Sequence, residues 1–259
     1  MREVLVRIDG LGVRYADSAD AALQDVSLDL MRGERLAIVG ESGSGKSTLA
    51  LALAGLLPAG ASISGTIGSP RDLRPGRDIG FVFQDPGSSL NPVLRIGEQI
   101  AEVSRRHLGH SWRDAYAHAL ALIERVRLPD PEKSARAFPH QLSGGQRQRV
   151  AIAEAIAAQA QLLIADEATS ALDTVVQAGI VSLLDDLVRE RGLTLAFITH
   201  DIALASGFAD RIAVLDHGRL VECGPAAAVI ARPEAERTRR LLANHIDLDT
   251  RPYIDRVAR

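Results

Sequence analysis

The sequence has little cysteine and little lysine, and it lacks a long apolar run. Its single cysteine, Cys223, excludes a disulfide within the chain and a metal cluster held by cysteines alone. One free thiol also fits a reducing compartment. Lysine occurs only as Lys46 and Lys133, so 28 of the 30 basic residues are arginine. We interpret this as codon bias, which makes a lysine inside a glycine-rich loop more informative.

A membrane span would need an apolar run of about 18 residues. The nearest candidate, residues 150–165, is interrupted by Glu154, Gln159 and Gln161. The first residues contain no long apolar segment of the signal-peptide kind, so the sequence predicts a protein that stays in the cytoplasm. The net charge of −3 argues against nucleic acid as a partner, because such binding needs a basic field.

The 259 residues suffice for one large domain or a domain with a subdomain, and their composition is that of a soluble globular protein. Apolar segments at 4–8, 11–15 and 26–30 predict antiparallel strands, with turns at Asp9-Gly10 and Arg32-Gly33.

Strands and helices alternate in the rest of the chain, and this alternation predicts a mainly parallel α/β sheet. Strands are expected at 36–39, 79–83, 162–165, 193–199, 211–215 and 219–223. A helical block from about 95 to 150, clearest at 113–126, predicts a subdomain inserted into the sheet domain.

A glycine-rich loop lies between the apolar segment 36–39 and a helix expected over 47–57. It fits the pattern G-x-x-x-x-G-K-S in the strand–loop–helix context that the pattern requires. Glycines let backbone N–H groups surround phosphate oxygens, Lys46 adds a full charge, and Ser47 binds Mg²⁺. A simple surface turn explains neither the lysine nor the flanking elements. The loop and the residue after it are Gly40, Glu41, Ser42, Gly43, Ser44, Gly45, Lys46, Ser47 and Thr48.

Asp166 and Glu167 follow an apolar strand, so they are expected at the carboxyl edge of a parallel sheet, where ligands bind. We predict that Asp166 orients Mg²⁺ through water and that Glu167 is the general base for an attacking water. Such a base contributes roughly 10²- to 10⁴-fold in rate. A solvated acidic pair is the alternative, but here a phosphate loop accompanies the pair.

Three further polar residues stand at the ends of predicted strands. Gln84 is a candidate contact for the metal and the water, and His200 is a candidate sensor of the γ-phosphate. An ordinary polar residue and a structural histidine are the simpler interpretations. Tyr15 is a candidate for stacking on adenine, with core packing as a close competitor.

A second glycine-rich segment, Ser143, Gly144, Gly145 and Gln146, opens a predicted helix, with Ser143 as its N-cap. It has no lysine. Helix capping alone explains the serine, but two glycines at a helix start leave backbone N–H groups open for an anion. Such a loop fits a lid on a nucleotide that another subunit holds.

Taken together, these motifs resemble the nucleotide-binding subunits of ATP-binding cassette (ABC) transporters, from Tyr15 to about Gly224. The resemblance identifies a Walker A loop at 40–47, a Q-loop at Gln84, a signature at 142–146 and a D-loop at 170–173. Asp166 and Glu167 then close the Walker B strand, and His200 is the switch histidine.

The resemblance implies an α/β P-loop NTPase fold of the ABC cassette type, with a mainly parallel sheet core, an N-terminal antiparallel β subdomain and an inserted helical subdomain. It implies ATP and Mg²⁺ as ligands, with Ser47, Gln84 and Asp166 at the metal. Glu167, His200 and Gln84 are then catalytic. In that family two subunits meet head to tail, so Ser143, Gly144, Gly145, Gln146 and Asp173 would contact a nucleotide on the partner.

Two short segments resemble the corresponding segments of the oligopeptide, dipeptide and nickel importer ATPases. They are Phe83-Gln84-Asp85-Pro86 and Ser89-Leu90-Asn91-Pro92. The resemblance implies two membrane-spanning permease subunits, contacted by residues 85–100, a second cassette that is identical or a paralogue, and an extracytoplasmic solute-binding protein. The expected place is the cytoplasmic face of the membrane, as a peripheral protein. The expected domains are an ATP-binding core at 1–94 and 160–231, a helical signature subdomain at 95–159 and a tail at 232–259.

The main hypothesis is an ATPase subunit that energises uptake of a peptide-like or metal-chelate solute. Two alternatives stay open. One is an ABC ATPase that acts outside transport, although such relatives usually carry two cassettes or a long coiled coil. The other is a regulatory cassette that binds ATP without turnover, although every assigned catalytic position holds a competent residue.

Overall fold

The computed structural model describes residues 3–70, 72–169 and 172–243. The described residues form two compact units: the first lies within residues 3–73 and 184–243, and the second within residues 74–183. Among the described residues, no helix is both long and apolar enough to cross a membrane. The domain boundaries expected from the sequence, at 94/95, 159/160 and 231/232, remain a prediction.

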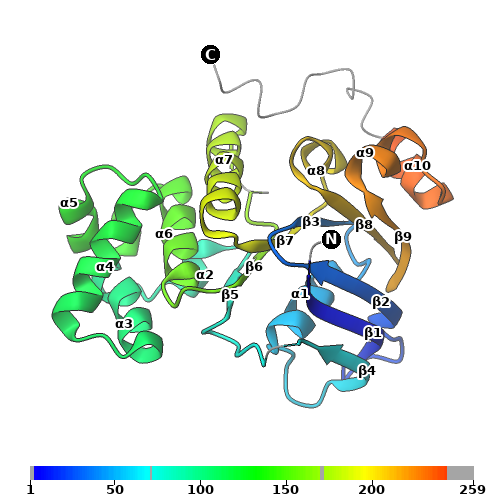
Figure 1. The fold of residues 1–259 in the computed structure, drawn as a ribbon, viewed down its shortest axis with the longest axis horizontal. Helices are drawn as coiled ribbons and strands as arrows, with labels where there is room; N and C mark the ends of the chain where they lie inside the picture. The colour runs from blue at the N-terminus through cyan, green and yellow to red at the C-terminus, as the bar shows by residue number, and fades with distance from the viewer. Residues whose placement is uncertain (1–2, 71, 170–171, 244–259) are drawn as a thin grey trace. The chain divides into compact units, whose positions relative to one another are not determined.

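The first unit opens with an antiparallel sheet in the order β2-β1-β4, drawn in blue and teal in Figure 1. Its strands are β1 (Val4–Arg14), β2 (Leu23–Met31) and β4 (Ser62–Gly68). Buried and exposed residues alternate along much of β1 and β2, as expected when one face of a sheet packs on a core. The antiparallel subdomain expected from the sequence is therefore present.

Two local features of this sheet differ from expectation. The predicted turn at Asp9-Gly10 is wrong, because β1 is one continuous strand. Gly10 has φ +57° and the pairing with β2 shifts between Ile8 and Leu11, so these residues form a bulge. Strand β4 was missed because it is exposed along its whole length, and its serines and glycines carry little strand signal.

The parallel part of the first unit places β3 (Arg35–Val39) between β7 (Thr194–Thr199) and β8 (Arg211–Asp216). Strand β9 (Arg219–Pro225) pairs antiparallel with β8. Residues 36–39 are fully buried, as expected for a strand with neighbours on both sides and helices on its faces. The helices of this unit are α1 (Lys46–Ala54), α8 (Ile202–Phe208), α9 (Ala226–Ala231) and α10 (Glu236–Ala243).

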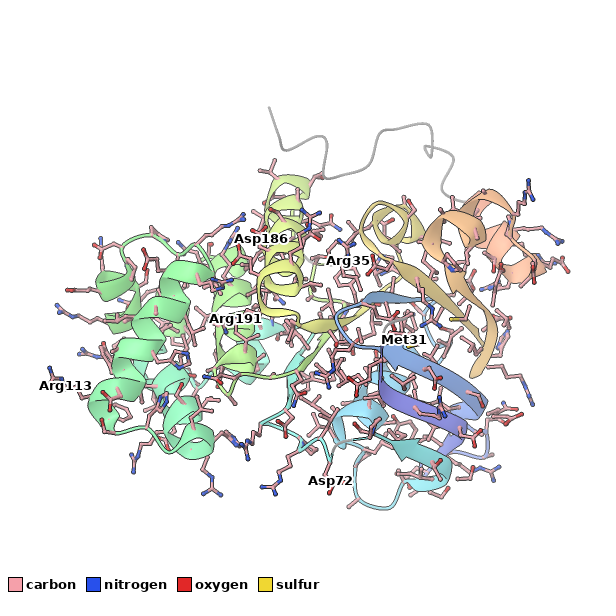
Figure 2. The ribbon with its side chains drawn as sticks, in the orientation of Figure 1. Met31, Arg35, Asp72, Arg113, Asp186 and Arg191 are labelled. Carbon is pink, nitrogen blue, oxygen red and sulfur yellow. The ribbon has the colours of Figure 1, made fainter. Side chains whose placement is uncertain are left out.

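Arg35, labelled in Figure 2, fixes the start of β3. Its guanidinium forms ion pairs with Asp185 and with Asp210, the second at 2.6 Å. Burial acts to lower the pKa of Arg35, but the hydrogen bonds and charges of the two aspartates outweigh it and raise that pKa above its usual value. The charge therefore stays on, and the strand that leads to the glycine-rich loop is anchored at its first residue.

The second unit contains a parallel pair of strands, β5 (Ile79–Val82) and β6 (Leu162–Asp166). Its helices are α2 (Pro86–Ser89), α3 (Ile96–Leu108), α4 (Trp112–Arg125), α5 (Pro131–Arg136), the 3₁₀ helix η1 (Pro139–Gln141) and α6 (Gly144–Ile156). Helix α7 (Thr174–Arg191) contains the boundary to the first unit.

Helix α4 is the amphipathic helix predicted over 113–126. Ala115, Ala119, Leu122 and Ile123 form its buried face, whereas Arg113 points outward in Figure 2. Helix α6 packs closely on β5 within this unit. A Cβ at Gly80 would lie 2.2 Å from the carbonyl oxygen of Ala155, so only glycine allows this approach. The contact fixes the helix that carries the second glycine-rich segment.

Candidate functional site

The glycine-rich loop of residues 40–47 connects β3 to α1 in the first unit. Gly45 is the N-cap of α1 and has φ +100°. A Cβ at Gly45 would lie 2.7 Å from the carbonyl oxygen of Ala22, so both the backbone angle and the space require glycine. Gly43 has φ +80° and open space around it. The loop therefore bends tightly over α1 and leaves its tip accessible.

Lys46 is the buried cation of this loop. Its side chain is buried, and Nζ donates hydrogen bonds to the carbonyl oxygens of Gly40, at 2.9 Å, and Glu41, at 2.8 Å. The loop thus curls around the ammonium group. Ser44 lies beside it with a buried hydroxyl that has no hydrogen-bond partner among the described residues. A buried hydroxyl in that state is costly unless a ligand satisfies it.

Tyr15 and Thr48 connect the end of β1 to helix α1. The Tyr15 phenol and the Thr48 hydroxyl share a hydrogen bond of 3.1 Å, and the tyrosine is half-buried. Ser47, one position before Thr48, is exposed. The structure therefore places Tyr15 next to the phosphate-type loop, and its stacking on a base remains a prediction.

Gly218 supports the loop from the β8–β9 turn, a role that the sequence pattern does not reveal. Its N–H donates to the carbonyl oxygen of Ser44 at 3.0 Å, and its own carbonyl accepts from the N–H of Gln24 at 2.7 Å. Gly218 has φ +76°, and a Cβ there would lie 2.7 Å from the Ala22 carbonyl oxygen. The only sequence signal was a turn residue between two strands, which says nothing about what the turn touches.

His200 follows β7, the strand next to β3. Val39 pairs with Thr199, so the loop and His200 leave neighbouring strands at the same edge of the sheet. The His200 side chain is exposed. Asp201 caps α8 by accepting from the N–H of Leu204 at 2.9 Å, which fixes the turn that carries the histidine.

In the second unit, strand register brings Gln84 and Glu167 together. Val82 on β5 pairs with Ala165 on β6, so Gln84 and Glu167, which each lie two positions further along, are also neighbours. Gln84 Nε2 donates to Glu167 Oε2 at 2.9 Å. Asp166 ends β6 and is 8% exposed. Glu167 has φ +46°, a strained value for a residue with a side chain.

The second glycine-rich segment forms the start of α6. Ser143 is the N-cap, as predicted: its hydroxyl accepts from the N–H of Gln146 at 3.3 Å, and the Gln146 side chain accepts from the N–H of Ser143 at 2.9 Å. This reciprocal pair is a capping box. Gly144 and Gly145 supply the first two helical positions. The serine hydroxyl thus has a structural role whatever else it contacts.

Asp173 caps the neighbouring helix α7. Its Oδ1 accepts from the N–H groups of Val175, at 3.1 Å, and Val176, at 3.0 Å. Ser170 and Ala171, the first half of the predicted D-loop, lie outside the described residues. The Cβ of an alanine at Gly145 would lie 2.5 Å from Val176 Cγ1, so α6 and α7 approach closely at the signature.

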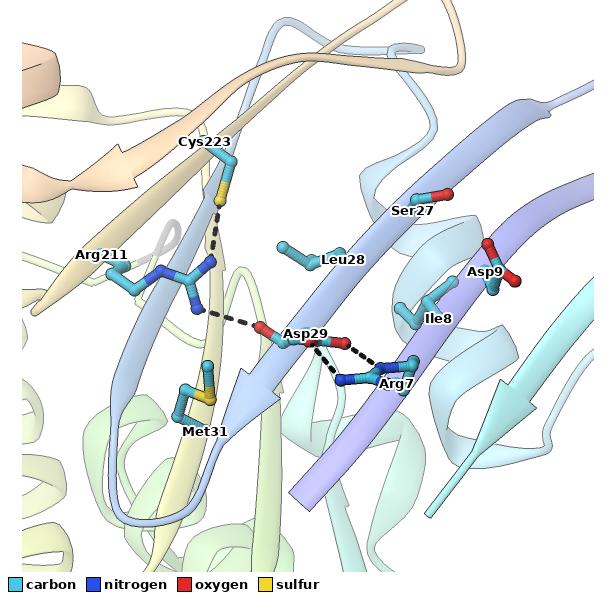
Figure 3. A pocket seen from close by; sticks show the side chains of 9 residues that line it. All are labelled: Arg7, Ile8, Asp9, Ser27, Leu28, Asp29, Met31, Arg211 and Cys223. Atoms are coloured by element: carbon cyan, nitrogen blue, oxygen red, sulfur yellow. Dashed lines mark hydrogen bonds and ion pairs between the residues drawn. The ribbon is translucent and has the colours of Figure 1, made fainter. Parts of the chain in front are cut away.

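A separate pocket lies against the antiparallel sheet of the first unit, as Figure 3 shows. Arg7 pairs with Asp29 at 2.9 Å, and Arg211 donates to the Asp29 carbonyl at 2.9 Å and to Cys223 Sγ at 3.3 Å. Burial raises the pKa of the Cys223 thiol, although Arg211 opposes this shift. These groups satisfy one another, and none of them belongs to the predicted site.

The family model described as ABC transporter matches residues 23–170. This chain belongs to the ABC transporter family. It is 45% identical over 254 residues to the peptidoglycan transport ATP-binding protein YejF of Agrobacterium fabrum, a match that covers 92% of this chain and 46% of the relative. It is 42% identical to the oligopeptide transport ATP-binding protein OppD of Salmonella typhimurium, over 89% of this chain and 72% of the relative. The chain thus spans about half of the first relative and most of the second.

Solved structures give the same result. The dimeric post-hydrolysis structure of the ATP-binding cassette MJ0796 with ADP and Pi matches with a TM-score of 0.72 and 31% identity, covering 86% of this chain and 99% of that one. CbiO1 from Clostridium perfringens, part of the transporter complex cbiONQ, matches with a TM-score of 0.76 and 28% identity, covering 94% of this chain and 97% of the other.

The comparisons confirm the predicted P-loop cassette fold, the ATPase class and ATP as the nucleotide. YejF, OppD and a putative peptide import protein of Brucella melitensis are each named as an ATP-binding protein of transport or import.

Proposed function

We propose that this cassette hydrolyses ATP to energise solute uptake, with ATP held by residues 40–48 and acted on by Gln84, Asp166 and Glu167. The observation that carries the proposal is the hydrogen bond between Gln84 and Glu167 at the carboxyl ends of two paired strands. A carboxylate held there by an amide, on a strained backbone, is suited to be a positioned base.

The phosphate loop binds the triphosphate through its backbone N–H groups, through Lys46 and through the N-terminus of α1. The unpartnered Ser44 hydroxyl and the bends at Gly43 and Gly45 suit this ligand. For Mg²⁺, which takes few protein oxygens and keeps several waters, the exposed Ser47 hydroxyl, the Gln84 amide oxygen and the Asp166 carboxylate are donors of the right kind. When bound, Mg²⁺ neutralises charge on the phosphate oxygens.

In the proposed hydrolysis step, each role is assigned to a side chain of this protein. Glu167 accepts a proton from water as the water oxygen attacks the γ-phosphorus, and the bond to the ADP oxygen breaks. Gln84 orients the water, and His200 contacts the γ-phosphate. Tyr15 contributes a face for adenine. Without Glu167 the loss in rate is expected to be at least 10²-fold.

The signature acts on the nucleotide of a second cassette, through Ser143, Gly144, Gly145 and Gln146, with Asp173 beside it. The solved dimer of a related cassette supports this arrangement. The second cassette is an identical chain or a paralogue. Completion of each site by the other chain explains why the signature has glycines and a capped helix but no lysine.

The solute is peptide-like, with a metal chelate as the other class within the subfamily. Relatives of this chain are named for oligopeptide, glutathione and peptide import. Permease subunits would dock on residues 85–100, where Val93 is 75% exposed and Leu94 42% exposed. Exposed apolar side chains of this size are suited to a partner surface. The cassette then lies at the cytoplasmic face of the membrane, and a solute-binding protein delivers the cargo from outside.

Glu167→Gln tests the catalytic assignment. Purified chain with its co-purified membrane subunits should keep ATP binding, accumulate a closed dimer and lose steady turnover by at least 10²-fold. Size-exclusion chromatography with ATP and a phosphate-release assay measure the two effects. Near-normal turnover would remove Glu167 from the base role. Lys46→Ala is the comparison variant, since it should weaken ATP binding itself.

The proteins that co-purify with a tagged chain test the transport assignment. Two membrane proteins and a second cassette are the expected result. Recovery with ribosomes or DNA instead would contradict it.

A further inference from the structure

The C-terminal helix α10 is anchored to the first unit by a polar network. The Glu222 carboxylate on β9 accepts from the N–H groups of Glu234 and Ala235, each at 3.0 Å, and from the hydroxyl of Thr238. Thr238 is fully buried, and Leu241 packs into the core with Val229. Figure 1 shows α10 beside α9. Helix α10 is therefore held against the first unit by both polar and apolar contacts.

Arg237 on this helix reaches the phosphate loop. Its guanidinium forms an ion pair with Glu41, the second residue of the loop, and its Nε lies 3.2 Å from Asp216 Oδ1 at the end of β8. The Arg237 side chain is only 19% exposed, whereas that of Glu41 is 54% exposed. One arginine thus bridges the phosphate loop and the β8–β9 turn, next to the backbone bond between Gly218 and Ser44.

The electrostatic effect of this bridge follows from what the loop binds. Glu41 is a carboxylate within a loop that receives a polyanion, so alone it repels the ligand. Its backbone carbonyl also holds the Lys46 ammonium. Asp216 adds a second negative charge, and the His217 side chain 3.9 Å from that carboxylate is 93% exposed. Arg237 is therefore the partly buried charge that compensates the two carboxylates.

We propose that Arg237 is a positioning residue for nucleotide binding, which acts by neutralising Glu41 and by fixing the loop from outside. The proposal rests on the proposed function, because it needs residues 40–48 to bind ATP. It makes the C-terminal helix part of the nucleotide site without contact to the nucleotide. The class of ligand whose affinity depends on Arg237 is a nucleoside triphosphate or another polyphosphate.

The test is the affinity of the purified full-length chain for MgATP, measured by calorimetry. Arg237→Gln should weaken binding roughly three- to tenfold, the scale of a partly exposed charge interaction. Glu41→Gln should bind at least twofold more tightly, because the repulsion is removed. The double variant Glu41→Gln/Arg237→Gln should return to within twofold of the parent chain. This rescue separates charge compensation from mere docking of α10.

Arg240→Gln is the matched control, since Arg240 lies on the same helix, is 66% exposed and pairs with Glu236. It should leave the affinity within twofold. A double variant as weak as Arg237→Gln would overturn the proposal, as would Arg237→Gln with parental affinity. If Arg237→Gln does not fold, the test rests on Glu41→Gln alone. An affinity of Glu41→Gln for MgATP that is equal to or weaker than that of the parent chain would then overturn the proposal. Lys46→Ala separates failure of the Arg237 proposal from failure of the proposed function. If Lys46→Ala binds MgATP with the affinity of the parent chain, residues 40–48 are not the ATP-binding loop.

Discussion

At the residue scale, Glu167 and Glu154 of the second unit lie in contrasting environments. Glu167 stands at a strand end with an amide partner, Gln84, whereas Glu154 lies partly buried on α6. Burial disfavours the charged form of Glu154 and raises its pKa from 4.5 to about 7. Glu154 is thus a source of pH dependence in stability that is separate from the chemistry proposed for Glu167.

The sign of this dependence follows from the raised pKa. Below about pH 4.5 Glu154 is protonated in both the folded and the unfolded chain, so it has no effect. Between about 4.5 and 7 the unfolded chain loses the proton first, so the free energy of unfolding falls as the pH rises. Above pH 7 the penalty is constant, at up to about 3 kcal/mol.

Glu154→Gln removes this charge and should stabilise the chain at pH 8 by up to about 3 kcal/mol, with little difference at pH 4. Urea unfolding at the two pH values measures the effect. Glu124→Gln, at an exposed position on α4 of the same unit, is the control and should change stability little at either pH. An equal effect of Glu154→Gln at both pH values would contradict the argument.

At the scale of elements, the signature glycines differ in their packing. A Cβ at Gly145 would lie 2.5 Å from Val176 Cγ1 on α7, whereas a Cβ at Gly144 would have its nearest neighbour, Leu172 Cδ2, at 3.8 Å. Gly145 is therefore needed for the contact of α6 with α7. Gly144 has room for a side chain, so packing among the described residues does not require glycine at this position.

We expect Gly145→Ala to lower the free energy of unfolding by about 1–2 kcal/mol, because overpacking outweighs the gain in helix propensity. Gly144→Ala should be neutral or slightly stabilising. Thermal unfolding of the two variants beside the parent chain measures this difference. Equal melting temperatures for both variants would show that α7 yields to the extra methyl group at no cost.

At the scale of the whole molecule, the residues with proposed roles are divided between the two units of the chain. The phosphate loop and His200 belong to the first unit, and Gln84, Glu167 and the signature belong to the second. Ser143 is the residue where the structural and the functional role can be separated. Its hydroxyl caps α6, and in the assembled dimer it is proposed to contact ATP of the partner.

Ser143→Ala should reduce ATP hydrolysis by the assembled transporter at least tenfold while ATP affinity of the isolated chain stays within about twofold. Loss of the N-cap costs about 1 kcal/mol in stability. Ser111→Ala is the matched control, because Ser111 is the N-cap of α4 in the same unit and accepts from the Asp114 N–H. A similar loss of turnover in Ser111→Ala would assign the effect to stability alone.

The amino-acid sequence by itself determined the parts that depend on neighbours along the chain. The phosphate loop, the Ser143 cap and the strand that ends at Asp166 are all local, since backbone angles, capping and apolar runs act within a few residues. The exposed strand β4 and the bulge at Gly10 were not predicted from the sequence, because both form through pairing with another strand. Only the tertiary structure decided that Gln84 meets Glu167 and that Arg237 meets Glu41. Their separations of 83 and 196 residues are closed by strand register and by the docking of α10, and no local pattern records either.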